Sequence, residues 1–252
     1  LNAQTVVALD KSNGEEIWQQ TRKTDANMES RHSYASPVIY RDSKQSLLLT
    51  HGADYLAAHD LVNGDEIWRT GGLQGSLIYN PLYRFVATPA VVPGLIIVPS
   101  AKNGPVLAID PADAKGNITN SDEHIIWRRS KNTPDVPSPL IHDNLVYLCR
   151  ENGQLLCLDA GTGEEIYFER AHNKRHRGSP VYADGKIYLS GMDGTVTVIK
   201  AGPNFEVLNK NAMNERLAAS PAIANKTIYI RTHNALYAIA ESVSMTDKES
   251  SR

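Results

Sequence analysis

Residues 5–18 read TVVALDKSNGEEIW, and the same pattern returns at residues 55–68 as YLAAHDLVNGDEIW. A third copy, QLLCLDAGTGEEIY, stands at residues 154–167 with a tyrosine in the last position. Each copy places an apolar run before an aspartate, then a glycine turn, then a large aromatic residue. Trp127 belongs to the same series, displaced by an insertion around residues 111–123. A pattern that recurs in one phase along a chain indicates a repeat architecture.

A second marker, Ser-Pro or Thr-Pro, recurs in phase with the first. Proline is tolerated at the start of a strand, where its missing N–H is not required by the ladder. The dipeptide therefore marks the first strand of each unit. Successive copies lie 52, 50, 41 and 41 residues apart, at Ser36-Pro37, Thr88-Pro89, Ser138-Pro139, Ser179-Pro180 and Ser220-Pro221.

Each unit contains four short strands, called A to D in chain order. The turns between them carry pairs such as Asp184-Gly185 and Asp193-Gly194, which favour the positive dihedral angles of tight hairpins. No stretch of ten or more residues has helical periodicity. Four antiparallel strands per repeat predict an all-β protein whose sheets are the blades of a β-propeller. The recurring aromatic residues, Trp18, Trp68, Trp127 and Tyr167, are then wedges between adjacent blades.

The pattern Ala-x-Asp-x-x-x-Gly-x-x-x-Trp, at residues 8–18 and 58–68, resembles the tryptophan-docking repeat of quinoprotein dehydrogenases. With the Ser-Pro strand starts, the chain from Thr5 to Ala240 is similar to the PQQ-like propeller superfamily. That superfamily includes quinoprotein enzymes and a BamB-like non-enzymatic branch, and the resemblance implies a periplasmic or cell-envelope location. It leaves the function open, because one fold hosts many activities.

The units add up to one propeller domain over residues 1–240, followed by a polar segment, residues 241–252, that we expect to be disordered. The first unit has only C and D strands and the last stops after C, so the two ends cannot combine into one regular blade. An open ring leaves long strand edges, which natural sheets avoid. We therefore expect the five to six blades of this chain to be part of a seven- or eight-bladed ring.

The composition excludes several classes of protein. Hydrophobic residues make up 41% and charged residues 21% of the 252 residues, which is typical of a globular chain. The 26 basic and 28 acidic residues give a net charge of −2, which argues against a nucleic-acid partner. The longest apolar runs, such as residues 95–98, are strand-sized, so no transmembrane segment is predicted. Because the chain starts at Leu1 without a leader-type segment, we expect a removed leader or an internal piece of a longer chain.

Propeller geometry assigns each loop to one of two faces. The D–A and B–C connections lie on one face, which we call the basic loop face because basic residues are in excess there. Acidic residues are in excess on the opposite face, which carries the A–B and C–D connections. We expect a binding rim on the basic loop face, for an acidic protein or another anionic ligand, formed by Arg31, Arg84, His176, Arg177 and Arg216. The alternative is a solvated charged rim without a ligand.

The densest basic segment, residues 170–177, contains His172 and His176 four positions apart. On a helix that spacing would suggest a metal-binding pair, but this segment is a loop. We expect solvent-exposed histidines and no bound metal.

Catalytic signals are weak. The quinoprotein enzymes that the chain resembles carry a disulfide between adjacent cysteines, whereas Cys149 and Cys157 are eight residues apart. A two-residue turn at Asn152-Gly153 would pair residues whose numbers sum to 305, which places the two cysteines on opposite faces of one hairpin. We expect two buried free thiols, no catalytic residue and no cofactor.

These expectations favour a monomeric, non-catalytic scaffold or binding module of the bacterial cell envelope. The first alternative is a quinoprotein-related enzyme with an active site in the central channel. The second is an extracellular sensor domain of a larger protein.

Overall fold

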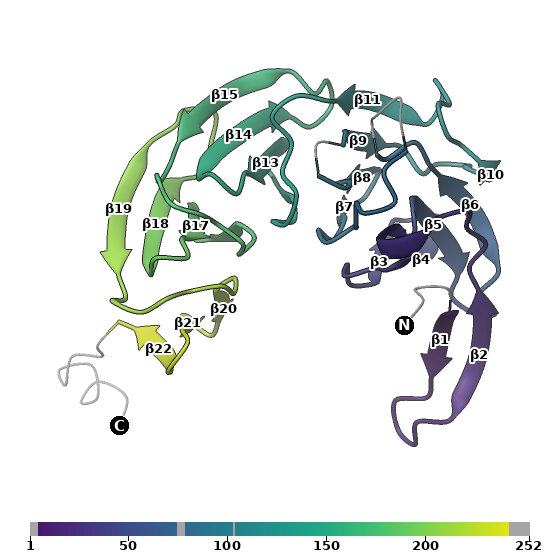
Figure 1. Cartoon of the computed structure of the whole chain (residues 1–252), viewed down its shortest axis with the longest axis horizontal. Helices are drawn as coiled ribbons and strands as arrows, with labels where there is room; N and C mark the ends of the chain where they lie inside the picture. Colours follow the sequence, from purple (N-terminus) through teal and green to yellow (C-terminus); the bar gives the residue numbers. More distant parts are fainter. Residues whose placement is uncertain (1–4, 75–78, 103, 242–252) are drawn as a thin grey trace.

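The computed structural model describes residues 5–74, 79–102 and 104–241, and these residues are built almost entirely from β-strands. The strands form six sheets that follow one another around an open arc (Figure 1). One short 3-10 helix, η1, spans Met28–Arg31. Within the described ranges no helix is both long and apolar enough to cross a membrane. Most of the predicted disordered tail, residues 242–252, lies outside the described residues.

The six sheets succeed one another in chain order. The first contains β1 (Thr5–Leu9) and β2 (Glu16–Thr21). The second contains β3 (Val38–Arg41), β4 (Ser46–Gly52), β5 (Tyr55–Asp60), β6 (Glu66–Thr70) and β10 (Gly116–Asn117). The third contains β7 (Ala90–Val92), β8 (Leu95–Val98), β9 (Val106–Ile109) and β11 (Ile125–Arg129). The fourth contains β12 (Leu140–His142), β13 (Leu145–Cys149), β14 (Gln154–Asp159) and β15 (Glu165–Arg170). The fifth contains β16 (Val181–Ala183), β17 (Lys186–Ser190), β18 (Thr195–Lys200) and β19 (Val207–Ala212), and the sixth β20 (Ala222–Ala224), β21 (Thr227–Arg231) and β22 (Leu236–Ala240).

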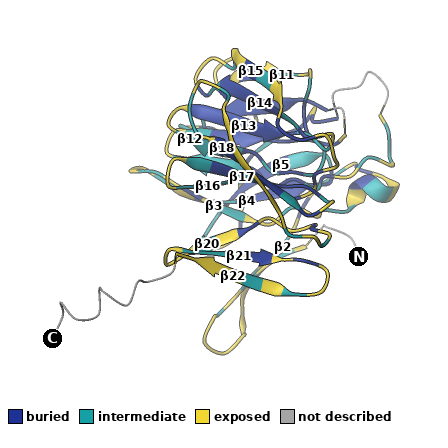
Figure 2. Ribbon diagram, turned by 90° about the vertical axis from the view of Figure 1, so that its left-hand side faces the viewer, coloured by how far each residue is buried: buried dark blue, intermediate teal, exposed yellow. Residues whose placement is uncertain are grey.

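In each complete sheet, strands A to D form the antiparallel meander that the repeat predicts. In the fourth sheet the order is β12, β13, β14, β15, and these strands are A, B, C and D of the unit. The first strand of a sheet lies on the inner side of the arc and the last on the outer side (Figure 1). Burial is greatest in the middle strands, such as β13 and β14, whereas β19 and β22 are largely exposed (Figure 2).

The hydrophobic core lies between neighbouring sheets, because side chains alternate along each strand. In β13, Val146 and Leu148 pack toward the third sheet with Ile97 and Trp127. The alternate residue Tyr147 packs toward the fifth sheet, in the cluster that contains Leu189 and Ile199. Every middle sheet is therefore buried on both faces, as a stack of propeller blades requires.

The recurring tryptophans connect one sheet to the next. The indole N–H of Trp18 donates to the carbonyl of Leu61 at 3.2 Å, and that of Trp127 donates to the carbonyl of Ala160 at 2.8 Å. Each indole lies directly against the repeat glycine of the following unit, Gly64 for Trp18 and Gly163 for Trp127. The predicted wedges are thus equivalent at these two positions.

Trp68 differs, because the insertion of residues 111–123 changes the next unit. The insertion crosses to the second sheet and adds β10 in parallel to β6, with Gly116 opposite Trp68. Trp68 is 1% exposed, and its indole N–H has no hydrogen-bond partner among the described residues. The carbonyl of Pro111, which follows the unit's aspartate as Leu61 and Ala160 do, accepts instead from the side chain of Gln45 at 3.0 Å.

The Ser-Pro and Thr-Pro markers form a hydrogen-bonded series between sheets. In each step the backbone N–H of one marker donates to the hydroxyl of the next marker along the chain, at 2.8–3.0 Å. The series runs from Ser36 through Thr88, Ser138 and Ser179 to Ser220. The hydroxyl of each marker therefore accepts the backbone N–H at the start of strand A in the preceding unit. This contact explains why Ser or Thr recurs at this position.

The cysteine hairpin has a different register from the one predicted. Cys149 pairs with Leu155, and Cys157 pairs with Tyr147, so paired numbers sum to 304. The turn has three residues rather than two, closed by hydrogen bonds between Arg150 and Gln154 in which the backbone N–H of Arg150 donates at 2.8 Å. Both cysteines consequently face the same core, where they are buried and free. The expectation of two buried thiols is confirmed, but their placement on opposite faces was wrong.

Candidate protein-binding face

The D–A and B–C connections lie together on one face, as the propeller geometry predicts. In the loop after β15, the backbone N–H of His176 donates to the carbonyl of Glu151 in the β13–β14 turn at 2.8 Å. The same loop accepts from the β17–β18 turn, where the N–H of Met192 donates to the carbonyl of Arg175 at 2.7 Å. In the next unit the N–H of His233 donates to the carbonyl of Arg216 at 3.1 Å. Backbone hydrogen bonds thus hold the loops that carry the predicted arginines.

The loop of residues 171–178 is anchored by two buried histidines. His172 is 8% exposed, and its Nε2 lies 3.1 Å from both carboxylate oxygens of Asp193. His176 is fully buried, with its ring edge-on to that of His172 at 5.6 Å between centroids. The expectation that both histidines are solvated was wrong, because their rings fill the space between the loop and the β17–β18 turn. His176 therefore presents no ring surface to a ligand.

Burial also sets the ionisation of His176. Desolvation of its ring, with a further contribution from the nearby His172, lowers the pKa of His176 to about 4. The ring is consequently neutral at physiological pH and acts as a packing residue. The side chains of Lys174, Arg175 and Arg177 around it are exposed to solvent.

Arg31 and Arg84 both lie at η1, Arg31 within it and Arg84 beside Glu29. The Nε of Arg31 donates to the carbonyl of Ala26 at 3.0 Å. The guanidinium of Arg84 lies 3.6 Å from the carboxylate of Glu29 and 5.6 Å from the centre of the Tyr34 ring. The Arg84 side chain is about half exposed, so its charge is screened by water and only partly balanced by Glu29.

An acidic pair lies among the basic loops. One carboxylate oxygen of Glu151 accepts the backbone N–H groups of Asp135 and Val136 at 2.9 and 2.6 Å. Burial of the carboxyl group raises the pKa of Asp135, and the negative charge of Glu151 adds a smaller rise. The positive charges of Lys102, Arg84 and Arg175 oppose that rise. Asp135 is therefore within electrostatic range of cations from three separate loops.

The structure brings together a different set of residues from the one predicted. The charges of Arg84, Arg175 and Lys102 all act on the pKa of Asp135, and the predicted binding rim included only Arg84 of these four residues. Arg177 and Arg216 are exposed on the same face. Arg22, in the first D–A connection, is instead buried, with its guanidinium donating to the carbonyls of Gly52 and Tyr55 at 2.8 and 3.2 Å.

One sequence signal could have found part of this set. Arg84, Arg175 and Arg216 each stand four positions before the Ser or Thr of a Ser-Pro or Thr-Pro marker. Arg31 and Arg177 do not occupy that position. Three units therefore carry an arginine at the same place in the repeat.

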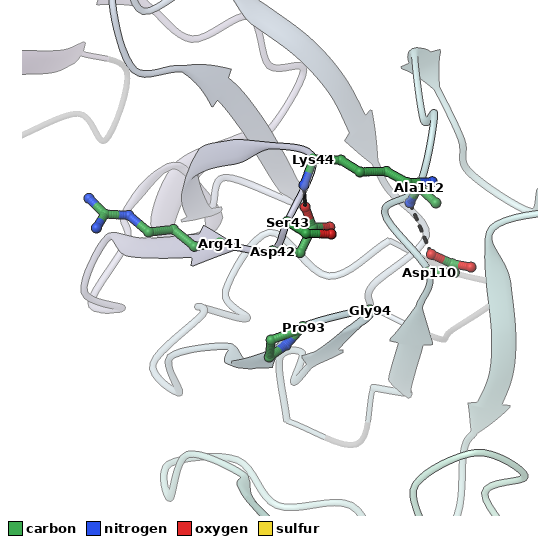
Figure 3. A pocket seen from close by; sticks show the side chains of 8 residues that line it. All are labelled: Arg41, Asp42, Ser43, Lys44, Pro93, Gly94, Asp110 and Ala112. Atoms are coloured by element: carbon green, nitrogen blue, oxygen red, sulfur yellow. Dashed lines mark hydrogen bonds between the residues drawn. The ribbon is translucent and has the colours of Figure 1, made fainter.

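The opposite face carries a broad hollow of about 730 Å³ between the β3–β4 turn and the start of the insertion (Figure 3). Its two carboxylates are already engaged by neighbouring groups. Asp42 accepts the N–H groups of Lys44 and Gln45 at 2.7 and 2.8 Å, and Asp110 accepts the N–H of Ala112 at 2.9 Å. Across the described ranges no group of three or more His, Cys, Asp or Glu side chains is arranged to hold a metal ion.

Stacked four-stranded meanders, pinned by indole rings and started by Ser-Pro or Thr-Pro, define the PQQ-like class of β-propellers. A family model described as outer membrane protein assembly factor BamB matches residues 114–241, and the chain belongs to this family. No curated protein matches the sequence.

Solved structures show the same fold at low sequence identity. The crystal structure of BamB from Moraxella catarrhalis gives a TM-score of 0.70 at 17% identity, covering 93% of this chain and 66% of that one. The computationally designed protein Ika8 gives 0.66 at 13% identity, covering 94% of this chain and 65% of that one. The designed protein Ika4 gives 0.53 at 14% identity, covering 71% of this chain and 99% of that one. The chain thus spans about two thirds of the length of BamB and of Ika8.

Proposed function

We propose that this chain is a non-catalytic binding module of the bacterial cell envelope that holds an acidic protein on its basic loop face. The observation that carries the proposal is that the exposed cations Arg84, Lys102 and Arg175, on three loops of that face, all act on the pKa of Asp135. Backbone hydrogen bonds fix the D–A loops, so little conformational entropy is lost when a partner binds. Positive charges on fixed loops favour rapid encounter with an acidic surface.

The family supports the cell-envelope part of this proposal. BamB is described as an outer membrane protein assembly factor, which is a role in protein assembly at the envelope. By extension, the partner is a protein and the location is the periplasm. A monomeric state and a complete ring of seven or eight blades are further parts of the proposal.

Charge reversal on the two faces tests the proposal. The triple variant Arg84→Glu, Arg175→Glu, Arg216→Glu changes the basic loop face, and Arg41→Glu, Lys44→Glu, Lys115→Glu makes the same charge change on the opposite face. All six side chains are exposed. Binding of a fluorescent polyglutamate peptide is followed by anisotropy at low and at physiological ionic strength.

We expect the basic-face variant to lose about tenfold or more in affinity, and the opposite-face variant to lose much less. Both variants should unfold thermally near the wild-type temperature, because surface charges contribute little to stability. Equal losses in the two variants would show that net charge, rather than this face, determines binding. Undiminished binding by the basic-face variant would contradict the proposal directly.

A further inference from the structure

A second hollow on the basic loop face lies between the outer strands of two neighbouring sheets. Its volume is about 470 Å³, which is enough for one or two side chains of a partner. It lies between the end of β15, the start of β18 and the end of β19. Its lining residues are Arg170, Ala171, His172, Asn173, Thr195, Lys210 and Ala212.

Hydrogen bonds hold one wall of the hollow, formed by Ala171 and His172, in place. The backbone N–H groups of Ala171 and His172 both donate to the carbonyl of Gly153, at 3.0 and 3.1 Å. Asp193 binds the His172 ring and also accepts the N–H and hydroxyl of Thr195 at 3.2 and 3.1 Å. The Asp193 carboxylate is therefore engaged by the wall itself.

Two cations line the hollow, one from each of the two sheets. Arg170, at the end of β15, donates from Nη1 to the carbonyl of Asn152 at 2.9 Å, which fixes its guanidinium and leaves its other N–H groups available. Lys210, on β19, is exposed. Neither side chain forms an ion pair with any described residue. Asn173 adds a neutral amide, and Ala171 and Ala212 supply an apolar backing.

We propose that this hollow binds an aspartate or glutamate side chain of the acidic polypeptide held by the basic loop face, with Arg170 and Lys210 donating to its carboxylate. The inference rests on the proposed function and adds a defined contact to it. A carboxylate is the group that a fixed guanidinium recognises best, with two parallel hydrogen bonds. The methylene groups of a glutamate match the apolar backing.

The test compares Lys210→Gln and Arg170→Gln with Lys23→Gln, an exposed lysine on the same face but outside the hollow. Lys210→Gln and Lys23→Gln change the net charge identically, so the comparison isolates position. With labelled polyglutamate as the probe, we expect Lys210→Gln and Arg170→Gln each to lower affinity about tenfold. Lys23→Gln should change it about twofold or less.

A second measurement guards against misfolded variants. In the wild-type protein, polyglutamate should shift the His172 imidazole resonances in NMR spectra, and a neutral polyglutamine peptide should not. Inorganic phosphate and free glutamate are then compared as competitors of the labelled polyglutamate at equal concentrations of negative charge. If phosphate displaces the peptide as well as glutamate does, the assignment to a side-chain carboxylate is overturned.

The outcomes separate this inference from the proposed function. If polyglutamate does not bind the wild-type protein, both fail. Suppose that polyglutamate binds and that charge reversal at Arg84, Arg175 and Arg216 abolishes binding. If Lys210→Gln then behaves like Lys23→Gln, the proposed function stands and only the proposed contact in the hollow is wrong. Loss of affinity at Lys210 and Arg170 with retained thermal stability supports the contact.

Discussion

The glycine that each indole touches provides a sharp test of how the sheets are stacked. Gly163 has a φ of +72°, and a Cβ at that position would lie 2.7 Å from two atoms of the Trp127 indole. Gly64 has a φ of +77°, and its Cβ would lie within van der Waals radii of the Trp18 ring. Gly14 occupies the same repeat position with a φ of +79°, but a Cβ there would meet nothing within 4 Å among the described residues. The three glycines thus share a backbone conformation and differ in what lies behind them.

Substitution of these glycines by alanine separates the cost of the left-handed backbone from the cost of displacing the indole. The left-handed backbone alone costs an L-residue about 1 kcal/mol, and in the 252-residue chain Gly14→Ala should show only that loss in the free energy of unfolding. Gly163→Ala must in addition displace the Trp127 ring, which loses packing and the 2.8 Å hydrogen bond to Ala160. Overpacking costs about 1–3 kcal/mol and a lost hydrogen bond about 1 kcal/mol. We therefore expect Gly163→Ala to destabilise the protein by about 3–5 kcal/mol in total, which is about 2–4 kcal/mol more than Gly14→Ala.

The assay is urea unfolding followed by tryptophan fluorescence for all three variants. Gly163→Ala and Gly64→Ala should lose at least twice as much stability as Gly14→Ala, with a shifted emission maximum for the displaced indole. The difference between positions cancels the backbone contribution, because φ is nearly the same. Equal losses at Gly14 and Gly163 would mean that the indole does not pack against the following sheet, and the stacked architecture would be wrong.

Three further predictions address the strand-A series, the buried histidine and the acidic pair. Ser179→Ala leaves the Ser138 N–H without its acceptor, so thermal unfolding should occur about 2–4 °C lower than in the exposed control Ser43→Ala. His176 binds its proton less readily in the folded state, with a pKa of about 4 against 6.5, so its contribution to stability is complete above pH 6.5 and is lost as the pH falls toward 4. Urea unfolding at both pH values should therefore show a pH-dependent loss on the order of 3 kcal/mol that His176→Leu removes, and an unchanged pH profile would contradict the buried neutral ring. Asp135→Asn should raise polyglutamate affinity about threefold in anisotropy titrations, compared with Asp113→Asn on the opposite face, and a lowered affinity would contradict the electrostatic role of Asp135.

The periodic residues made the fold predictable. The Ser-Pro starts and the glycine-aromatic spacing recur because each unit packs against its neighbours in the same way. In the structure both kinds of marker form contacts between sheets. Positions that obey the repeat were therefore predicted correctly from one sequence, except Trp68, where the insertion replaces the contact with the next unit. The strands, their antiparallel order and the equivalence of Trp18 and Trp127 all follow from this periodicity.

The wrong predictions concern segments whose structure is set by local interactions and not by the repeat. Whether the turn at residues 151–153 has two or three residues depends on a competition between hairpin types that share the Asn-Gly signal, and one residue of difference moved a cysteine to the other face. The insertion carries no periodic signal, so its pairing with β6 was invisible. His172 and His176 look solvated in a basic sequence, yet the space left beneath the loop is filled by their rings.

The proposed function, together with the repeat positions of the arginines, predicts what an acidic partner would present. Arg84, Arg175 and Arg216 stand at one repeat position, so the framework displays them alike on their units. The unit between Arg84 and Arg175 breaks this pattern, because its loop carries Pro134 and Asp135 instead. The side chains of Asp135 and Glu151 therefore place acidic groups in the unit between those of Arg84 and Arg175. A partner with a continuous acidic surface meets like-charge repulsion at that point, whereas one with acidic groups on both sides of a neutral or basic residue does not. Because such repulsion distinguishes between partners of equal net charge, the proposed function predicts that the acidic pair adds specificity that a uniformly basic face would lack.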